Sequence, residues 1–234
     1  MARTVTLSEL RTRVRRRADM VNSTFVSDDE INQFINDSIA ELYDLLMQKF
    51  GEDYYTIPTA DQSFVTDQLY YDLPSDFLKI VGCDLKVQGD NYVTIKPYMF
   101  SERNQFNTLL SRGVLAYEAT RYRLIGESIY FTQVPSGTGS YRLWYIPYQP
   151  VLTTDSDTFN GFNGWEKWVE IQAAKECLMK EESDTSAMEN ELARINARIE
   201  RAAGNRDAGF SYRVTDVRNI VDDEVGIFTI NRYY

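Results

Sequence analysis

Hydrophobic residues near the amino terminus recur at helical spacing behind two capping patterns. Residues 6–9 and 27–30 both have the order Ser/Thr-x-x-Glu, which is typical of a capping box at a helix start. The apolar positions that follow are Leu7, Leu10, Val14 and Ala18 in the first case, and Ile31, Phe34, Ile35, Ile39, Leu42, Leu45 and Leu46 in the second. This pattern predicts a first helix of about three turns and a long amphipathic helix that ends at Gly51.

Between residues 53 and 150 the pattern changes to alternation, which is typical of half-buried strands. The alternating runs cover residues 69–73, 81–87, 92–95, 122–125, 129–131 and 141–146. Residues 126–128 join two runs closely enough to predict a tight hairpin, and residues 137–139 are predicted to be a second hairpin turn. With one short helix near residues 100–110, we predict an antiparallel module of about five to seven strands.

Helical spacing returns after Gly164. Apolar residues from Trp165 to Met179 cover almost the whole circumference of the predicted helix, which indicates burial on more than one side. Residues 185–203 are predicted to form a further helix with a narrow seam against one partner helix. The seam residues follow 4-3-4-3 spacing and are Met188, Leu192, Ile195, Ile199 and Ala202.

The order of these elements predicts an α+β fold. Residues 1–52 and 160–204 would form a helical bundle body from both ends of the chain, and residues 53–159 an antiparallel β module inserted into it. Residues 205–234 would form an extended C-terminal arm. No internal repeat accompanies this order.

The predicted arm is rich in aromatic and β-branched residues, although it has no helical period of useful length. A segment that stays disordered is normally poor in such residues, because they favour burial. The composition therefore indicates a segment that needs a partner surface.

The composition adds two constraints. The 234 residues carry a net charge of −10, but the first 20 residues hold six arginines against two acidic residues, so the remainder carries −14. A strongly acidic body disfavours a grip on nucleic acid by the whole protein. No apolar run is long enough to span a bilayer, and residues 1–20 lack the apolar core of a signal peptide, so we expect no membrane association.

The sequence contains few candidates for catalytic or metal-binding side chains. Histidine is absent, which excludes histidine-dependent triads and His-containing zinc sites. Cys83 and Cys177 lie far apart in apolar contexts and are interpreted as buried free thiols in a reducing compartment. Since no carboxylate pair stands out among 35 acidic residues, we predict no catalytic residue, no cofactor and no metal site.

Two clusters have more than one interpretation. The arginines of residues 11–17, with Arg13, Arg15 and Arg16 away from the apolar stripe, form a solvated helix face, a charged contact with another subunit or a phosphate contact. Trp165 and Trp168 share one predicted helix face that belongs to the core or to a subunit interface, with a ligand platform as the weaker alternative.

Three short motifs are interpreted as structural. Residues 155–157 and 222–224 are acidic but lack the spacing of a calcium loop, so the first is expected to be a polar turn and the second a solubilising or partner-pairing run. Residues 137–139 are too short for a phosphate-binding loop.

Several stretches resemble the head-to-tail adaptor (connector) proteins of tailed phages. The similar stretches are residues 8–11, 17–20, 25–36, 71–77 and 142–147, and the resemblance runs from end to end of the chain. It implies a structural protein rather than an enzyme, with a helical bundle, an inserted β domain and a C-terminal arm. It further implies a ring, typically dodecameric, beneath the portal protein.

The resemblance also implies partners and a location. The arm would dock on the portal protein, the ring would extend the DNA channel without sequence-specific binding, and a tail or nozzle protein would bind the lower face. The protein would assemble in the host bacterial cytoplasm and reside in the virion neck. Aromatic and arginine side chains dominate interfaces, so the expected portal contacts are Phe210, Tyr212, Arg213, Asp216, Arg218, Ile227, Phe228, Tyr233 and Tyr234.

The expected subunit contacts are Arg13, Arg15, Arg16, Trp165 and Trp168.

Two other function classes stay open from the residues alone. One is a carbohydrate-processing hydrolase that uses an Asp/Glu pair on the tyrosine-rich module, and the other is a DNA-binding regulator that uses the N-terminal arginine helix.

Overall fold

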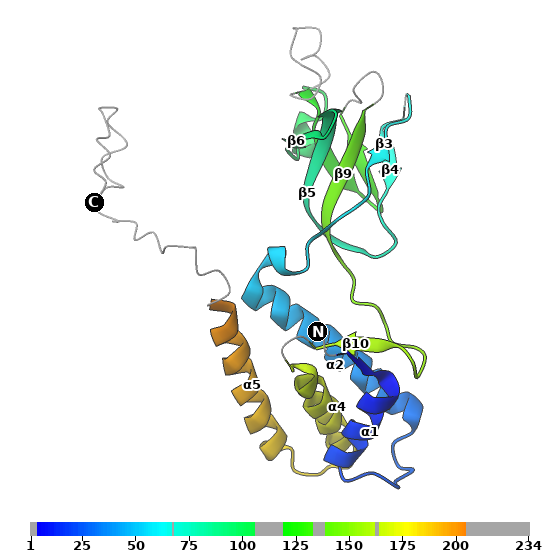
Figure 1. The fold of residues 1–234 in the computed structure, drawn as a ribbon, viewed down its shortest axis with the longest axis vertical. Coiled ribbons are helices and arrows are strands. Elements are labelled where there is room, and N and C mark those ends of the chain that lie inside the picture. Colours follow the sequence, from blue (N-terminus) through cyan, green and yellow to red (C-terminus); the bar gives the residue numbers. More distant parts are fainter. Residues whose placement is uncertain (1–3, 67, 106–118, 133–138, 162–163, 205–234) are drawn as a thin grey trace, which may run out of the picture.

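The fold is α+β, as predicted. The computed structural model describes residues 4–66, 68–105, 119–132, 139–161 and 164–204. Within these residues, four α-helices accompany three antiparallel sheets. The helices gather at one end of an elongated molecule and the two larger sheets at the other (Figure 1).

Helices α1 (Leu7–Arg17) and α2 (Asp28–Phe50) confirm the first two predictions. The hydroxyls of Thr6 and Ser27 accept hydrogen bonds from the backbone N–H groups of Glu9 and Glu30, and both glutamates bond back to the backbone of the capping residue. These caps satisfy backbone donors that a helix start would otherwise leave without a partner.

Helices α4 (Glu166–Lys180) and α5 (Ser186–Gly204) form the second half of the helical region. Helix α4 packs against α1, α2 and α5, which explains why apolar residues surround its circumference. The predicted apolar seam on α5 is observed, because Leu192, Ile195 and Ile199 are buried, but α5 packs against two helices, α2 and α4, rather than one. The ends of α2 and α5 lie together, and Lys49 Nζ is 2.7 Å from Glu200 Oε1.

The largest sheet has the order β2-β9-β5-β6, and β3 also pairs with β9. Its strands are β2 (Ile57–Pro58), β3 (Gln62–Ser63), β5 (Phe77–Gln88), β6 (Asn91–Ile95) and β9 (Ser140–Pro147). The second sheet has the order β4-β8-β7, with β4 (Tyr70–Asp72), β7 (Tyr122–Ile125) and β8 (Ser128–Phe131). The predicted hairpin of residues 122–131 is confirmed: Ile125 pairs with Ser128, and Gly126 has the positive φ of 61° that suits this turn.

The predicted hairpin turn at residues 137–139 is wrong, because the strands before and after it do not pair with each other. A hairpin would pair β8 with β9, but β8 pairs with β4 and β7, whereas β9 pairs with β2, β3 and β5. The chain therefore crosses between sheets here, and residues 137 and 138 themselves lie outside the described part. The short helix expected near residues 100–110 is represented by one 3-10 turn, Phe100–Glu102, and residues 106–110 also lie outside it.

A two-stranded ribbon was not predicted. Strand β1 (Thr4–Thr6) pairs with β10 (Thr158–Asn160), with Val5 opposite Phe159. Three-residue strands are too short to show alternation, so the sequence pattern contains no signal for them. The ribbon ties the start of α1 to the segment that leads into α4.

Two clusters of buried residues form the interior. The first joins α1, α2, α4 and α5 with Val5, Leu152 and Phe159. The second lies between the two larger sheets, where the ring of Tyr141 is 4.9 Å from that of Phe131 and 5.2 Å from that of Tyr71. Tyr71, Tyr122 and Tyr141 thus fill a core rather than present their rings to solvent.

Replacement of Gly161 by alanine tests the approach of β10 to α4. A methyl group at Gly161 would lie 2.7 Å from the Cα of Glu166 and closer still to its backbone nitrogen. We expect G161A to lower the free energy of unfolding by about 3 kcal/mol, because backbone atoms must move to admit the methyl group. Denaturant titration followed by circular dichroism measures this. The matched control is G204A, where a methyl group meets nothing within 4 Å; equal stability of the two variants would contradict the predicted overlap.

Candidate interaction site

Arg15 organises the loop between α1 and α2. Its guanidinium donates hydrogen bonds to the backbone carbonyls of Met20, Ser23 and Val26 at 3.0–3.3 Å and to Asp28 Oδ1 at 2.6 Å. The hydrogen bond from Arg15 also holds the pKa of the Asp28 carboxyl below its usual value. This side chain therefore has an internal structural role.

Arg13 and Arg17 bind one buried carboxylate. Arg13 Nη1 donates to Glu170 Oε1 at 2.9 Å, and Arg17 Nε donates to Glu170 Oε2 at 3.1 Å. Only 7% of the Glu170 side chain is exposed, and its hydrogen bond raises the pKa of Arg13. Burial of a carboxylate without partners raises the free energy of the folded state. The hydrogen bonds from the two arginines offset this cost and allow α4 to pack against α1.

Arg11 extends this pattern to the turn before β10. It donates to Asn32 Oδ1 at 3.0 Å and pairs with Asp155. The guanidinium groups at positions 11, 13, 15 and 17 thus face acids of the same chain, which removes the main support for a phosphate contact. Arg16 is different, because it is exposed and has no ion pair among the described residues.

The acidic residues 155–157 form a polar turn, the interpretation favoured from the sequence. Asp157 accepts hydrogen bonds from the backbone N–H groups of Thr153 and Thr154 at 2.7 and 2.8 Å and from the Thr154 hydroxyl at 2.6 Å. These bonds, that of the Thr154 hydroxyl first, lower the pKa of the Asp157 carboxyl. Its oxygens are occupied by the turn itself.

Trp165 and Trp168 lie in the core of the single chain, with 3% and 6% of each residue exposed. The Trp165 ring is 5.4 Å from that of Phe50, and Trp168 Nε1 donates to Asn196 Oδ1 at 2.8 Å. Of the three interpretations left open, the core one describes this position. Their assignment to a subunit interface stays a prediction, and their burial adds no support to it.

The predicted arm lies outside the described residues. This applies to the whole expected portal contact, namely Phe210, Tyr212, Arg213, Asp216, Arg218, Ile227, Phe228, Tyr233 and Tyr234, and to the acidic run 222–224.

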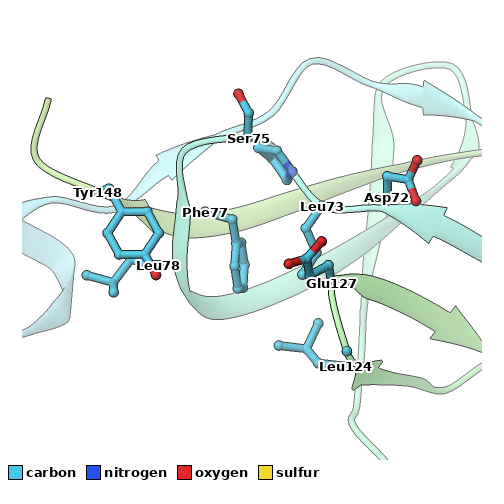
Figure 2. A pocket seen from close by; sticks show the side chains of 10 residues that line it. Asp72, Leu73, Ser75, Phe77, Leu78, Leu124, Glu127 and Tyr148 are labelled. Atoms are coloured by element: carbon cyan, nitrogen blue, oxygen red, sulfur yellow. The ribbon is translucent and has the colours of Figure 1, made fainter.

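An acid-rimmed hollow of about 460 Å³ lies beside the β4–β5 loop (Figure 2). Its apolar lining comes from Leu73, Pro74, Phe77, Leu78, Leu124 and Tyr148. Asp72 and Glu127 are exposed at its rim, and its lining within the described part of the chain includes no basic residue. Such a site suits an apolar side chain that is accompanied by a positive charge.

A second, uncharged hollow of about 290 Å³ lies between α2 and the ribbon. Helix α2 contributes Ile39, Leu42, Tyr43 and Leu46, and the remaining lining residues are Tyr55, Gln149, Pro150, Thr158, Phe159 and Asn160. We call this hollow the α2–β10 groove. None of its lining residues carries a charge, so it suits an apolar, neutral occupant.

The two hollows adjoin one segment of the chain. Tyr148 lines the first hollow, Gln149 and Pro150 line the second, and Val151 follows. Tyr148 is 57% exposed and Val151 68% exposed, which is unusual for large apolar side chains so close together. We call residues 148–151 the waist segment, because they connect the sheets to the helical region (Figure 1). The waist segment and its two hollows are the candidate interaction site.

The sequence analysis missed this site. A possible signal was the apolar run after the last strand, with Pro147 and Pro150 limiting regular structure. Alternation alone does not show which apolar residues stay exposed.

A polar cluster on the largest sheet surrounds Asp61. Its carboxylate accepts hydrogen bonds from Tyr92 Oη at 2.8 Å, Lys86 Nζ at 3.0 Å and Arg142 Nε at 2.9 Å. The bonds from Tyr92 and Lys86 are the main reason that the pKa of Asp61 is lowered to about 2. The cluster clamps the segment that carries β3 onto β9, β5 and β6.

The described residues offer little reactive chemistry. They contain no group of three or more His, Cys, Asp or Glu residues that could hold a metal ion. Burial raises the pKa of the Cys177 thiol to about 11 and raises that of Cys83 as well, which leaves both thiols protonated at neutral pH. In the same part of the chain, no helix has the length and apolar character required to cross a membrane.

Comparison with known proteins gives one finding. The model of the family described as SU10 adaptor protein matches residues 5–218, which is most of the chain. A search of curated proteins gives no match.

Paired substitutions separate the structural arginines from the exposed one. We expect R13A to lower the free energy of unfolding by about 2 kcal/mol, because it removes a charged hydrogen bond from a buried carboxylate. R16A should change it by less than about 0.5 kcal/mol, as is usual for an exposed site without partners. Urea titration of both variants gives the comparison; a neutral R13A would show that Arg17 alone satisfies Glu170.

The Asp61 cluster predicts a definite pH dependence. Because the folded-state pKa of Asp61 is depressed, its contribution is complete above the ordinary pKa of about 3.9 and is lost as the pH falls toward about 2. The melting temperature of the wild type should therefore exceed that of D61N by a constant amount from neutral pH down to about pH 5. The difference should shrink in more acidic buffer. A difference that already disappears between pH 7 and 5 would contradict the depressed pKa.

Proposed function

Because this chain belongs to the SU10 adaptor protein family, a family of phage head-to-tail adaptors, we propose that it joins the head of a tailed phage to its tail as a structural ring. The ring docks on the portal protein, extends the channel for the packaged DNA and receives a tail or nozzle protein. The observation that carries this proposal is the family match over residues 5–218. It agrees with the resemblance found in the sequence.

The proposed organisation assigns each part of the chain a task. Residues 1–52 and 160–204 form the helical body, residues 53–159 the inserted β module and residues 205–234 the docking arm. Two separate buried clusters, one among the helices and one between the sheets, support a division into body and module. The β1–β10 ribbon departs from these bounds, because Thr158 and Phe159 fall within the range of the module but pair with β1, and Leu152 and Phe159 belong to the buried cluster of the helices.

The arm supplies the portal contact in this proposal. Its aromatic and arginine residues are the types that dominate interface energies, and the family match extends into it as far as residue 218. Phe210, Tyr212, Arg213, Asp216 and Arg218 lie within the matched range, whereas Ile227, Phe228, Tyr233 and Tyr234 lie beyond it.

Ring contacts use the outside of the body and the waist segment. Of the N-terminal arginines proposed for subunit contacts, Arg16 has the exposure that such a contact requires, while Arg13 and Arg15 already have internal partners. A heterologous (head-to-tail) interface repeats the same two complementary patches around a closed ring. The exposed Tyr148 and Val151 are further candidates for one of these patches.

Passage of DNA requires weak interaction with the channel wall. The net charge of −10 favours repulsion of phosphates over binding, and the paired arginines of α1 offer few free cations. The proposed role involves no catalytic step and no cofactor, and places the protein in the virion neck after assembly in the host bacterial cytoplasm.

Deletion of residues 205–234 tests the proposed function. We expect the shortened protein to keep a helical circular dichroism spectrum and cooperative unfolding, but to lose binding to purified portal rings. Light scattering of the protein alone and with portal rings measures both the ring state and the binding. Binding of the shortened protein with unchanged affinity would refute the arm as the portal contact.

A finer comparison replaces side chains within the arm. The double variant F210A/Y212A should bind portal rings about 30-fold more weakly, which corresponds to about 2 kcal/mol for lost aromatic anchors. The control S211A/T215A changes polar neighbours in the same segment. Equal weakening by both pairs would show that the effect is not due to the aromatic anchors.

A further inference from the structure

The α2–β10 groove is an apolar hollow that the described residues line but do not fill. Its floor consists of α2 side chains that are almost fully buried, and Thr158, Phe159 and Asn160 form its wall. Successive residues of a strand point to opposite faces. Since three successive residues of β10 all line the groove, the strand borders it with its edge.

Strand β10 has one strand partner among the described residues. Strand β1 pairs with β10, and no second strand among the described residues does so. An apolar groove bordered by a strand is a general docking site for an extended segment, because the groove selects the side chains of its occupant.

The chain itself continues next to this site. Helix α5 ends at Gly204, and Glu200 near its end pairs with Lys49 on α2. Leu46, three residues before Lys49, lines the groove. A further 30 residues follow Gly204, so residue 225 is within reach, because 21 extended residues span up to about 70 Å.

One part of this continuation matches the groove chemically. Residues 225–231, Val-Gly-Ile-Phe-Thr-Ile-Asn, form the longest uncharged stretch after Gly204 and are rich in β-branched residues. The groove lining is also uncharged. The other hollow, with Asp72 and Glu127 at its rim, suits a basic occupant instead and is a poorer match.

We propose that, in the free protein, residues 225–231 of the same chain occupy the α2–β10 groove. This docking shelters Ile227, Phe228 and Ile230 from solvent before assembly. The inference rests on the proposed function in one respect: the arm must leave the groove when it engages the portal, so the two binding events compete. The groove thereby regulates when the arm is available.

A photo-crosslinking experiment on the full-length chain tests the docking. Thr158 is exposed at the groove, and both native cysteines are buried, so the variant T158C takes up a benzophenone maleimide at one position. After irradiation, mass spectrometry identifies the linked peptide, and a denaturing gel separates monomers from crosslinked dimers. The matched control is N91C, which carries the same label at an exposed position at the start of β6, in the largest sheet.

We expect T158C, and not N91C, to link to a peptide within residues 219–234, in the monomer band. A second variant, T158C with Ile227→Asp and Phe228→Asp, should lose this product, because the described groove lining has no cationic side chain to offset the burial of a carboxylate. Linkage in the dimer band would overturn the proposal in favour of the arm of a second copy. Linkage elsewhere, or the same products from T158C and N91C, would overturn docking of the arm altogether.

Addition of portal rings before irradiation separates this inference from the proposed function. A decrease of the T158C product on portal binding supports both. An unchanged product with bound portal means that the arm docks in the groove but is not the portal contact, which overturns the proposed release. Absence of the product, with portal binding still dependent on residues 205–234, overturns the docking and leaves the proposed function intact.

Discussion

Burial of helix α4 against three neighbouring helices is the constraint on which the rest of the fold depends. Its apolar circumference needs cover from more than one neighbour, and α1, α2 and α5 provide it. Glu170 is the cost of this burial, and Arg13 and Arg17 offset it with two charged hydrogen bonds. Since α1 and α2 come from the start of the chain and α4 from its second half, the residues between them must leave the helices and return.

The chain leaves the helices after α2 and returns before α4, and the returning part contains the waist segment. The sheets form their own core between Tyr71, Phe131 and Tyr141, so the helices need not cover them. The returning chain passes through residues 148–151 and then pairs as β10 with β1. This route leaves two hollows beside an exposed apolar segment, a combination that favours contact with other chains or segments over catalysis.

The N-terminal arginines illustrate how packing changes the meaning of a charge cluster. As sequence, six arginines within the first 20 residues are compatible with a solvated face, a subunit contact or a phosphate site. In the structure, carboxylates at positions 28, 155 and 170 take four of them, so the cluster consolidates the body. An adaptor must keep its shape in a larger assembly, and internal pairing of this kind fixes the relative positions of helices whose apolar contacts alone permit sliding.

The sequence by itself determined the α+β class, both capping boxes, the 122–131 hairpin and the family, because each depends on local spacing or on short stretches of residues. It did not determine the β1–β10 ribbon, the crossing between β8 and β9, or the partners of Arg13 and Arg15. These contacts join residues up to 157 positions apart, and neither periodicity nor composition encodes which distant carboxylate meets which arginine. The waist was hidden for the same reason: whether Tyr148 is core or surface depends on what covers it, and only the tertiary structure decides that.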